Sequence, residues 1–338
     1  MLSPLELMER LPPSPGAAVR VALSRQRVAR ALGRGCDDPA AGPRLLVLGP
    51  CSLHDPDAAL EYAAKLAGLS RAVGDTLVIA MRAYVEKSRT GLGWRGLAEE
   101  PGLDGVRDPV RGVEAARRLL VDLEATGLPI GVEIVSPHLW RYWIDVVSWA
   151  AVGARGTESQ ALREAAAALP VPCAFKNRLD GAVKPAVNAA LVASRACSFA
   201  GPGPDGSIAV LKAPGNPLPH VCLRGGRPVD GRRSVPNAGR ASRTGAELLE
   251  RGLVPAVIVD LGHDNSFLPG RLPRPGRRLI SDLRSGTVRG LMLESNLEPG
   301  NQPPGPVGTL RRGVSVTDPC VGWADTERFV AGVAESLS

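Results

Sequence analysis

The chain has 338 residues, a net charge of +7 and a hydrophobic content of 44%, which allows a large core in one big α/β barrel or in two ordinary domains. Its 41 basic and 34 acidic residues form no long block of one sign, which argues against a nucleic-acid-binding protein. No apolar run reaches the roughly 18 residues of a membrane span, and six cysteines without a CxxC pair, together with an N-terminus that lacks a signal-peptide pattern, indicate a reduced, cytoplasmic protein.

The first predicted element is a basic helix over Ala17–Leu32, inside an N-terminal extension of residues 1–43. From there to residue 338, short apolar runs alternate with helical patterns. The predicted strands are Arg44–Gly49, Leu77–Arg82, Pro129–Glu133, Ala151–Arg155, Pro172–Lys176, His220–Arg224, Ala256–Asp260 and Gly290–Glu294. The predicted helices include Asp57–Leu69, Val113–Glu124, Arg141–Trp149, Glu158–Ala167 and Gly245–Arg251. Eight strands that alternate with helices predict an α/β fold, a single (β/α)₈ TIM barrel over residues 44–338.

Two segments interrupt this alternation. Ser198–Pro219 and Arg227–Ala241 are rich in Gly, Pro or polar residues and carry no clear period. We interpret both as insertions on the rim of the barrel and not as linkers between domains.

Basic side chains stand at the ends of several predicted strands. Arg82, Arg155, Lys176 and Arg224 each close an apolar strand, and Lys87 follows the second one. For a single Arg, a solvated surface position is the more common explanation. In a parallel barrel, however, these ends meet at the active-site face, where clustered cations repel one another unless an anion binds. A substrate that carries phosphate and carboxylate would fit them.

A metal site is a second possibility. Cys51, His263 and Glu294 end the first, seventh and eighth strands, which are neighbours in a closed barrel, and Asp318 follows later. Their spacing alone is a weak signal, and a lone His near a strand end is more often a core or hydrogen-bonding residue. Their common placement is what favours a metal site.

At these residues the sequence resembles the microbial class I 3-deoxy-D-arabino-heptulosonate 7-phosphate (DAHP) synthases. The likeness extends from about Arg44 to Phe329. The matching motifs are Gly49–Pro56, Met81–Gly96, Gly153–Gln160, Phe175–Gly181, Leu223–Gly226, Asp260–Ser266, Leu293–Gln302 and Ser315–Trp323.

The resemblance implies that phosphoenolpyruvate and erythrose 4-phosphate condense with water to give DAHP and phosphate, the first step of the shikimate pathway. It implies one divalent metal ion, manganese before iron, cobalt or zinc, held by Cys51, His263, Glu294 and Asp318. The phosphoenolpyruvate-binding residues would be Arg82, Lys87, Glu133, Ala154, Arg155, Lys176 and Arg224. The erythrose 4-phosphate-binding residues would be Ser88, Arg89 and Thr90.

Within this assignment Cys51, Lys87 and His263 are the candidate catalytic residues. Lys87 is the candidate proton donor to the nascent alkoxide, and neighbouring cations are expected to lower its pKa and that of Lys176. The partners would be phosphorylated small molecules, with neither nucleic acid nor membrane, in a homodimer or homotetramer.

The sequence departs from the family pattern at Ser88, where the family has Pro, and at Gly156 and Gly262. Ser88 leaves open a related synthase that accepts another aldose phosphate or an amino analogue. A non-catalytic barrel that binds an anion is a third possibility, which four retained metal-ligand candidates disfavour. The N-terminal extension is shorter than in regulated relatives, which predicts weak feedback inhibition and allows a role in secondary metabolism.

Overall fold

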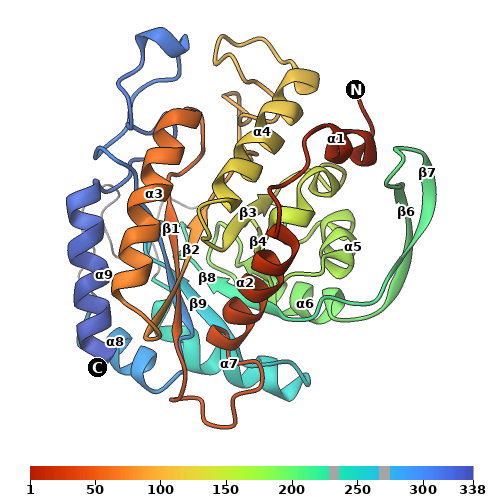
Figure 1. The fold of residues 1–338 in the computed structure, drawn as a ribbon. Helices are drawn as coiled ribbons and strands as arrows, with labels where there is room; N and C mark the ends of the chain where they lie inside the picture. Colours follow the sequence, from red (N-terminus) through yellow and green to blue (C-terminus); the bar gives the residue numbers. More distant parts are fainter. Residues whose placement is uncertain (228–235, 266–274, 338) are drawn as a thin grey trace.

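The computed structural model describes residues 1–227, 236–265 and 275–337, and its central element is a closed barrel of parallel strands (Figure 1). Around the barrel the order is β1, β10, β9, β8, β5, β4, β3 and β2. Their bounds are β1 Arg44–Gly49, β2 Leu77–Arg82, β3 Ile130–Ile134, β4 Trp149–Val152, β5 Cys173–Lys176, β8 Pro219–Leu223, β9 Val257–Asp260 and β10 Gly290–Glu294. The predicted TIM barrel is confirmed, and β1, β10 and β9 are neighbours as expected.

Helices surround the barrel and also precede it. Their bounds are α1 Pro4–Arg10, α2 Ala17–Ala31, α3 Pro56–Ala72, α4 Pro109–Glu124, α5 Gln160–Ala168, α6 Lys184–Ala193, α7 Ala241–Glu250, α8 Arg277–Arg284 and α9 Trp323–Leu337. Local sequence fixes several starts, because Asp55 and Asp108 accept hydrogen bonds from the first turns of α3 and α4, and a proline follows each at the first helical position. No helix in the described ranges is long and apolar enough to cross a bilayer.

Successive side chains of a barrel strand point alternately outward and inward, and this produces two hydrophobic cores. On β1, Leu46 and Leu48 pack outward against the surrounding helices, whereas Leu45 and Val47 face the barrel interior. The interior cluster also contains Val28 and other apolar residues of α2. The predicted basic helix of the N-terminal extension therefore covers the amino-terminal end of the barrel.

The prediction of a helix over Arg141–Trp149 was wrong. The segment forms two short 3-10 turns, Trp140–Tyr142 and Ile144–Val146, and Trp149 already begins β4. Buried aromatic and β-branched side chains dominate it, and such residues lose side-chain freedom in a helix. The fourth strand consequently begins two residues before its predicted start and ends at Val152, so Arg155 lies in the following loop.

The segment over Ser198–Pro219 is a two-stranded antiparallel ribbon, β6 Cys197–Pro202 and β7 Ile208–Ala213. It leaves the barrel after α6 and before β8, so it starts beside the amino-terminal ends of the strands, not beside their active-site ends. Asn216 anchors its base by donating to the carbonyl oxygens of Leu169 and Val171. The predicted rim insertion is therefore present here, and it lies at the amino-terminal rim of the barrel. Of the other one, residues 228–235 lie outside the described ranges.

Candidate active site

A cavity of about 610 Å³ opens at the carboxyl ends of the barrel strands. The predicted substrate-binding residues all line it, namely Arg82, Lys87, Ser88, Arg89, Thr90, Glu133, Ala154, Arg155, Lys176 and Arg224. Three of the four candidate metal ligands line it as well, His263, Glu294 and Asp318. Cys51 lies behind them, in contact with Asp318 and Lys87. Residues from almost every strand end thus meet at one mouth, as the barrel geometry requires.

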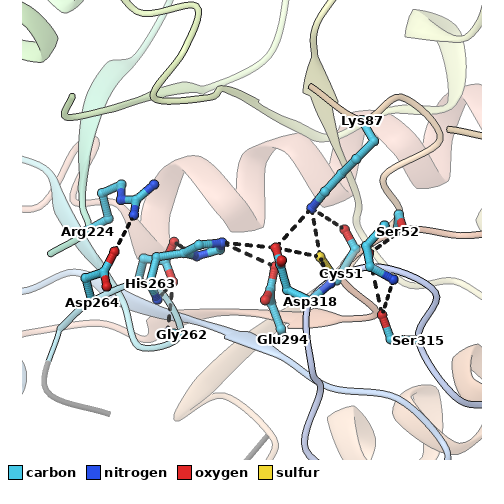
Figure 2. A network of polar contacts seen from close by, with 12 residues as sticks. Cys51, Ser52, Lys87, Arg224, Gly262, His263, Asp264, Glu294, Ser315 and Asp318 are labelled. Carbon is cyan, nitrogen blue, oxygen red and sulfur yellow. Dashed lines mark hydrogen bonds and ion pairs between the residues drawn. The ribbon is translucent and has the colours of Figure 1, made fainter. Parts of the chain in front are cut away.

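The candidate metal ligands form a compact group (Figure 2). Ligand atoms of Cys51, Glu294 and Asp318 all lie within 4.8 Å of one another, and the Cys51 sulfur is 3.3 Å from Asp318 Oδ2. His263 Nε2 points at the group, 3.7 Å from Glu294 Oε1 and 3.7 Å from Asp318 Oδ2. A thiolate, an imidazole and two carboxylates at these separations suit a divalent transition metal ion.

The electrostatics of the four candidate metal ligands also favour a bound metal ion. Burial opposes a proton on His263, but Asp260 and Glu294 outweigh it and raise the pKa of the ring to about 9. The group therefore attracts a positive charge, which a metal ion would supply in place of that proton. Glu294 Oε1 accepts no well-aligned hydrogen bond within the described residues, although Arg82 Nη2 lies 2.9 Å away, so its lone pairs can reach a cation.

Lys87 lies at the junction of the metal group and the cavity. Its ammonium is 2.7 Å from the Cys51 sulfur and 3.6 Å from Asp318 Oδ2. Burial alone would lower the pKa of Lys87, but its neighbours Cys51, Glu294 and Asp318 outweigh burial and raise it above its usual range. Asp260 does the same for Lys176. The prediction that neighbouring cations lower both pKa values was wrong, because the acidic groups beside each lysine outweigh both its burial and the nearby Arg82.

Two arginines in the cavity have no carboxylate within ion-pair distance in the described part of the chain, Arg89 and Arg155. Arg155 is held by hydroxyl groups instead, with Nε donating to Thr90 Oγ1 at 2.7 Å and Nη1 to Ser88 Oγ at 3.5 Å. Burial and the nearby Arg224 lower the pKa of Arg155. An anion in the cavity would relieve this repulsion, and the two guanidinium groups are free to bind it.

The other cations of the cavity are already paired. Arg224 Nη2 lies 2.8 Å from Asp264 Oδ2. Arg82 is only 1% exposed, donates to the Pro50 carbonyl oxygen and lies 3.8 Å from the centre of the Tyr84 ring. These contacts fix the direction of each side chain before a ligand arrives.

Two glycines allow the close approaches that shape the cavity. A Cβ on Gly153 would lie 2.0 Å from Glu133 Oε1, so any larger residue would displace this carboxylate. A Cβ on Gly225 would lie 1.8 Å from the Asp264 carbonyl oxygen. The loops after β8 and β9 can therefore touch, and Gly225 N–H donates to the His263 carbonyl oxygen at 2.7 Å.

Sequence reasoning missed the buried polar residues that support these side chains. Asp260 contacts both Lys176 and His263. Asn177 accepts the Arg224 backbone N–H, and Asn265 donates to the Leu223 and Asp260 carbonyl oxygens. Asp260 carried a usable signal, because a strand-ending carboxylate three residues before a candidate metal-binding His is a common way to orient the ring. Ser266, the last residue of the Asp260–Ser266 motif, lies outside the described ranges.

Comparison with known proteins agrees with this geometry. Residues 35–331 match the model of the DAHP synthetase I family. The Tyr-sensitive phospho-2-dehydro-3-deoxyheptonate aldolase of Salmonella typhimurium is 39% identical, over 100% of this chain and 93% of its own length. The Trp-sensitive enzyme of Enterobacter agglomerans is 40% identical, over 100% of this chain and 95% of its own. The structure of the Francisella tularensis aldolase superimposes with a TM-score of 0.87 at 33% identity, over 100% of this chain and 96% of that one. The chain therefore belongs to the DAHP synthetase I family.

Proposed function

We propose that this chain condenses phosphoenolpyruvate with D-erythrose 4-phosphate and water to give DAHP and phosphate. The observation that carries the proposal is one cavity in which Arg89 and Arg155, both without a carboxylate partner in the described ranges, face a group of four candidate metal ligands. An anionic substrate and an electrophile can therefore be held side by side. Family membership supports the same reaction.

We assign the phosphoenolpyruvate carboxylate and phosphate to Arg155, Lys176 and Arg224, with Arg82, Lys87, Glu133 and the Ala154 backbone around them. The Ala154 N–H donates to no group in the described residues, which leaves it available. We assign the phosphate of the aldehyde substrate to Arg89 and Thr90, beside Ser88. Backbone and guanidinium donors of this kind bind phosphate oxygens in several directions at once.

In the reaction, C3 of phosphoenolpyruvate forms the new carbon–carbon bond to the aldehyde carbon, and water adds at C2. The resulting phosphohemiketal expels phosphate and leaves the 2-keto acid. A divalent ion held by Cys51, His263, Glu294 and Asp318, manganese before iron, cobalt or zinc, would polarise the aldehyde carbonyl as a Lewis acid.

Lys87 is the proposed proton donor to the alkoxide that forms at the aldehyde carbon. Its anionic neighbours keep its pKa above the usual range, so it carries a proton at neutral pH. Its place beside the metal group, 2.7 Å from the Cys51 sulfur, supports this role. Cys51 and His263 complete the proposed catalytic set as metal ligands.

We also propose that residues 44–338 act as one catalytic barrel, with residues 1–43 as an extension, in a cytoplasmic homodimer or homotetramer. The β6–β7 ribbon stands away from the barrel in Figure 1, and it exposes Ile208 by 78% and Val210 by 74%. Apolar side chains on a projecting ribbon are suited to contact a second copy. Light scattering on the purified protein tests the assembly, and a monomer would contradict it.

The function is tested by phosphate release from both substrates with Mn²⁺, with Cys51→Ala as the inactive variant. Cys173→Ala is its matched control, because Cys173 is also a fully buried thiol but packs among the helices outside the cavity. We expect release that needs both substrates, a seven-carbon keto acid as product, loss of activity in Cys51→Ala only, and weaker Mn²⁺ binding by that variant. Activity of Cys51→Ala equal to that of Cys173→Ala would refute the assignment.

A second candidate substrate, another aldose phosphate or an amino analogue, is favoured by Ser88. The Ser88 hydroxyl accepts from Arg155 at 3.5 Å inside the cavity, and its backbone N–H donates to no group in the described residues. Proline could offer neither group. A panel of four- and five-carbon aldose phosphates, run on the wild type and on Ser88→Pro, tests it. Preference for erythrose 4-phosphate in both proteins would exclude this candidate.

A further inference from the structure

Asp260, the last residue of β9, joins the metal group to the phosphate-binding cations. A single carboxylate oxygen, Oδ2, lies 2.7 Å from Lys176 Nζ and 2.8 Å from His263 Nδ1. We propose that Asp260 is a positioning residue that sets the affinity of the protein for both the divalent metal ion and phosphoenolpyruvate, although it touches neither. This inference rests on the proposed function and adds a shared determinant of its two binding sites.

The buried carboxylate of Asp260 would destabilise the folded protein without its two close partners. The residue is completely buried and does not line the cavity. Moving a carboxylate out of water costs several kcal/mol, which only close partners can offset. Its Oδ1 accepts the backbone N–H groups of Gly262 at 3.0 Å and of His263 at 3.4 Å. The carboxylate is therefore fixed in one orientation, with Oδ2 left for Lys176 and the His263 ring.

For His263, this contact decides which ring nitrogen faces the metal group. With Nδ1–H donating to Asp260, Nε2 is the ring nitrogen directed at Glu294 and Asp318, each 3.7 Å away, and its lone pair would coordinate a metal ion bound there. Figure 2 shows the ring extended toward these carboxylates. Removing the acceptor would free the ring to rotate and to place its proton on Nε2, which would block coordination.

For Lys176, the same oxygen keeps a buried ammonium charged. Lys176 is only 6% exposed and has Arg82 as a nearby cation. Burial and a neighbouring cation both favour the neutral amine, so the carboxylate is what preserves the charge. Without it, the cavity would lose one of the cations that we assign to phosphoenolpyruvate.

The two effects belong to one side chain, so a single substitution should weaken both sites. Asp260→Asn keeps the size of the side chain but removes its charge and one acceptor oxygen. Its matched control is Asp145→Asn, because Asp145 forms a two-point ion pair with the completely buried Arg117, at 2.9 and 3.0 Å, away from the cavity. Both variants break a pair with a buried cation, but only Asp260 contacts the proposed site.

The experiment is calorimetric titration of metal-free wild type, Asp260→Asn and Asp145→Asn, once with Mn²⁺ alone and once with phosphoenolpyruvate alone. We expect Asp260→Asn to bind Mn²⁺ about 10- to 100-fold more weakly and phosphoenolpyruvate about tenfold or more weakly, from the loss of one charged contact. Asp145→Asn should lower the melting temperature and leave both constants unchanged. Wild-type constants in a folded Asp260→Asn, or loss of only one of the two, would overturn the shared role.

If the proposed function itself is wrong, the wild type will bind neither Mn²⁺ nor phosphoenolpyruvate. This result differs from the one that would overturn the role of Asp260, in which the wild type binds both. If Asp260→Asn does not fold, nitrogen-15 spectra of histidine-labelled wild type loaded with Zn²⁺ decide the question. We expect a His263 ring with its proton on Nδ1 and the metal on Nε2. The opposite arrangement would overturn the inference.

Discussion

His220, in β8, offers a test of the barrel interior, because protonating it should lower the stability of the folded protein. The ring is completely buried, Nδ1 lies 3.0 Å from the Leu218 carbonyl oxygen, and Trp149 Nε1–H donates to Nε2 at 3.1 Å. The neutral ring thus has Nδ1–H as its donor and Nε2 as its acceptor. A second proton would remove that acceptor and bury a charge. Burial lowers the pKa from 6.5 to about 4, against a smaller opposing effect of the Leu218 carbonyl.

The direction of the pH effect follows from the difference in proton binding between the folded and the unfolded protein. As the pH falls below 6.5, the unfolded chain takes up a proton at His220 that the folded protein refuses until about pH 4. The stability associated with the neutral ring is therefore complete above pH 6.5 and is lost as the pH falls from 6.5 to 4. The loss reaches about 2 kcal/mol at about pH 5 and about 3 kcal/mol in total, at 1.36 kcal/mol per pKa unit.

The assay is urea unfolding of the wild type and of His220→Gln at about pH 7.5 and about pH 5. Glutamine can still accept from Trp149 but does not titrate, and every other ionisable group is shared by the two proteins. The wild type should lose about 2 kcal/mol more than the variant between the two pH values. Equal losses in both proteins would refute the reasoning.

Three other results are expected. Gly153→Ala should displace Glu133 and lower kcat/KM by about tenfold or more with little change in melting temperature; unchanged kinetics would contradict the tight contact. Glu294→Gln should leave the buried Arg82 unpaired and cost about 3 kcal/mol of unfolding free energy in metal-free protein, measured with urea; a loss below about 1 kcal/mol would show that this ion pair contributes little. Phe, Tyr and Trp should inhibit phosphate release only weakly in dose-response assays, and strong inhibition by any of them at sub-millimolar concentration would contradict the prediction of weak feedback inhibition.

The barrel could be predicted because its strands leave a local signal. Arg44–Gly49, Leu77–Arg82 and Gly290–Glu294 have the predicted bounds, since each is a short apolar run that ends in a polar or glycine residue. Arg141–Trp149 could not be assigned by the same means, because its aromatic residues pack in the core as irregular turns and only the tertiary contacts decide its conformation.

The candidate site was accessible from the sequence at the level of residue types and strand ends. What the sequence could not provide was the set of close pairs. The pKa values of Lys87 and Lys176 depend on which groups surround each lysine, and these come from the loop after β1, from β9 and from the loop after β10. Supporting residues such as Asn177 and Asn265 are similarly ordinary in the sequence and acquire their role only from contacts between distant strands.

The pairing of β1 with β10 has a consequence for synthesis of the chain. About 240 residues separate the end of β1 from the start of β10, which at about 5–20 residues per second takes roughly 10 to 50 s to translate. During this interval one edge of β1, with its row of backbone N–H and C=O groups, has no native partner. A nascent chain of this protein should therefore depend on chaperones until its last strand leaves the ribosome.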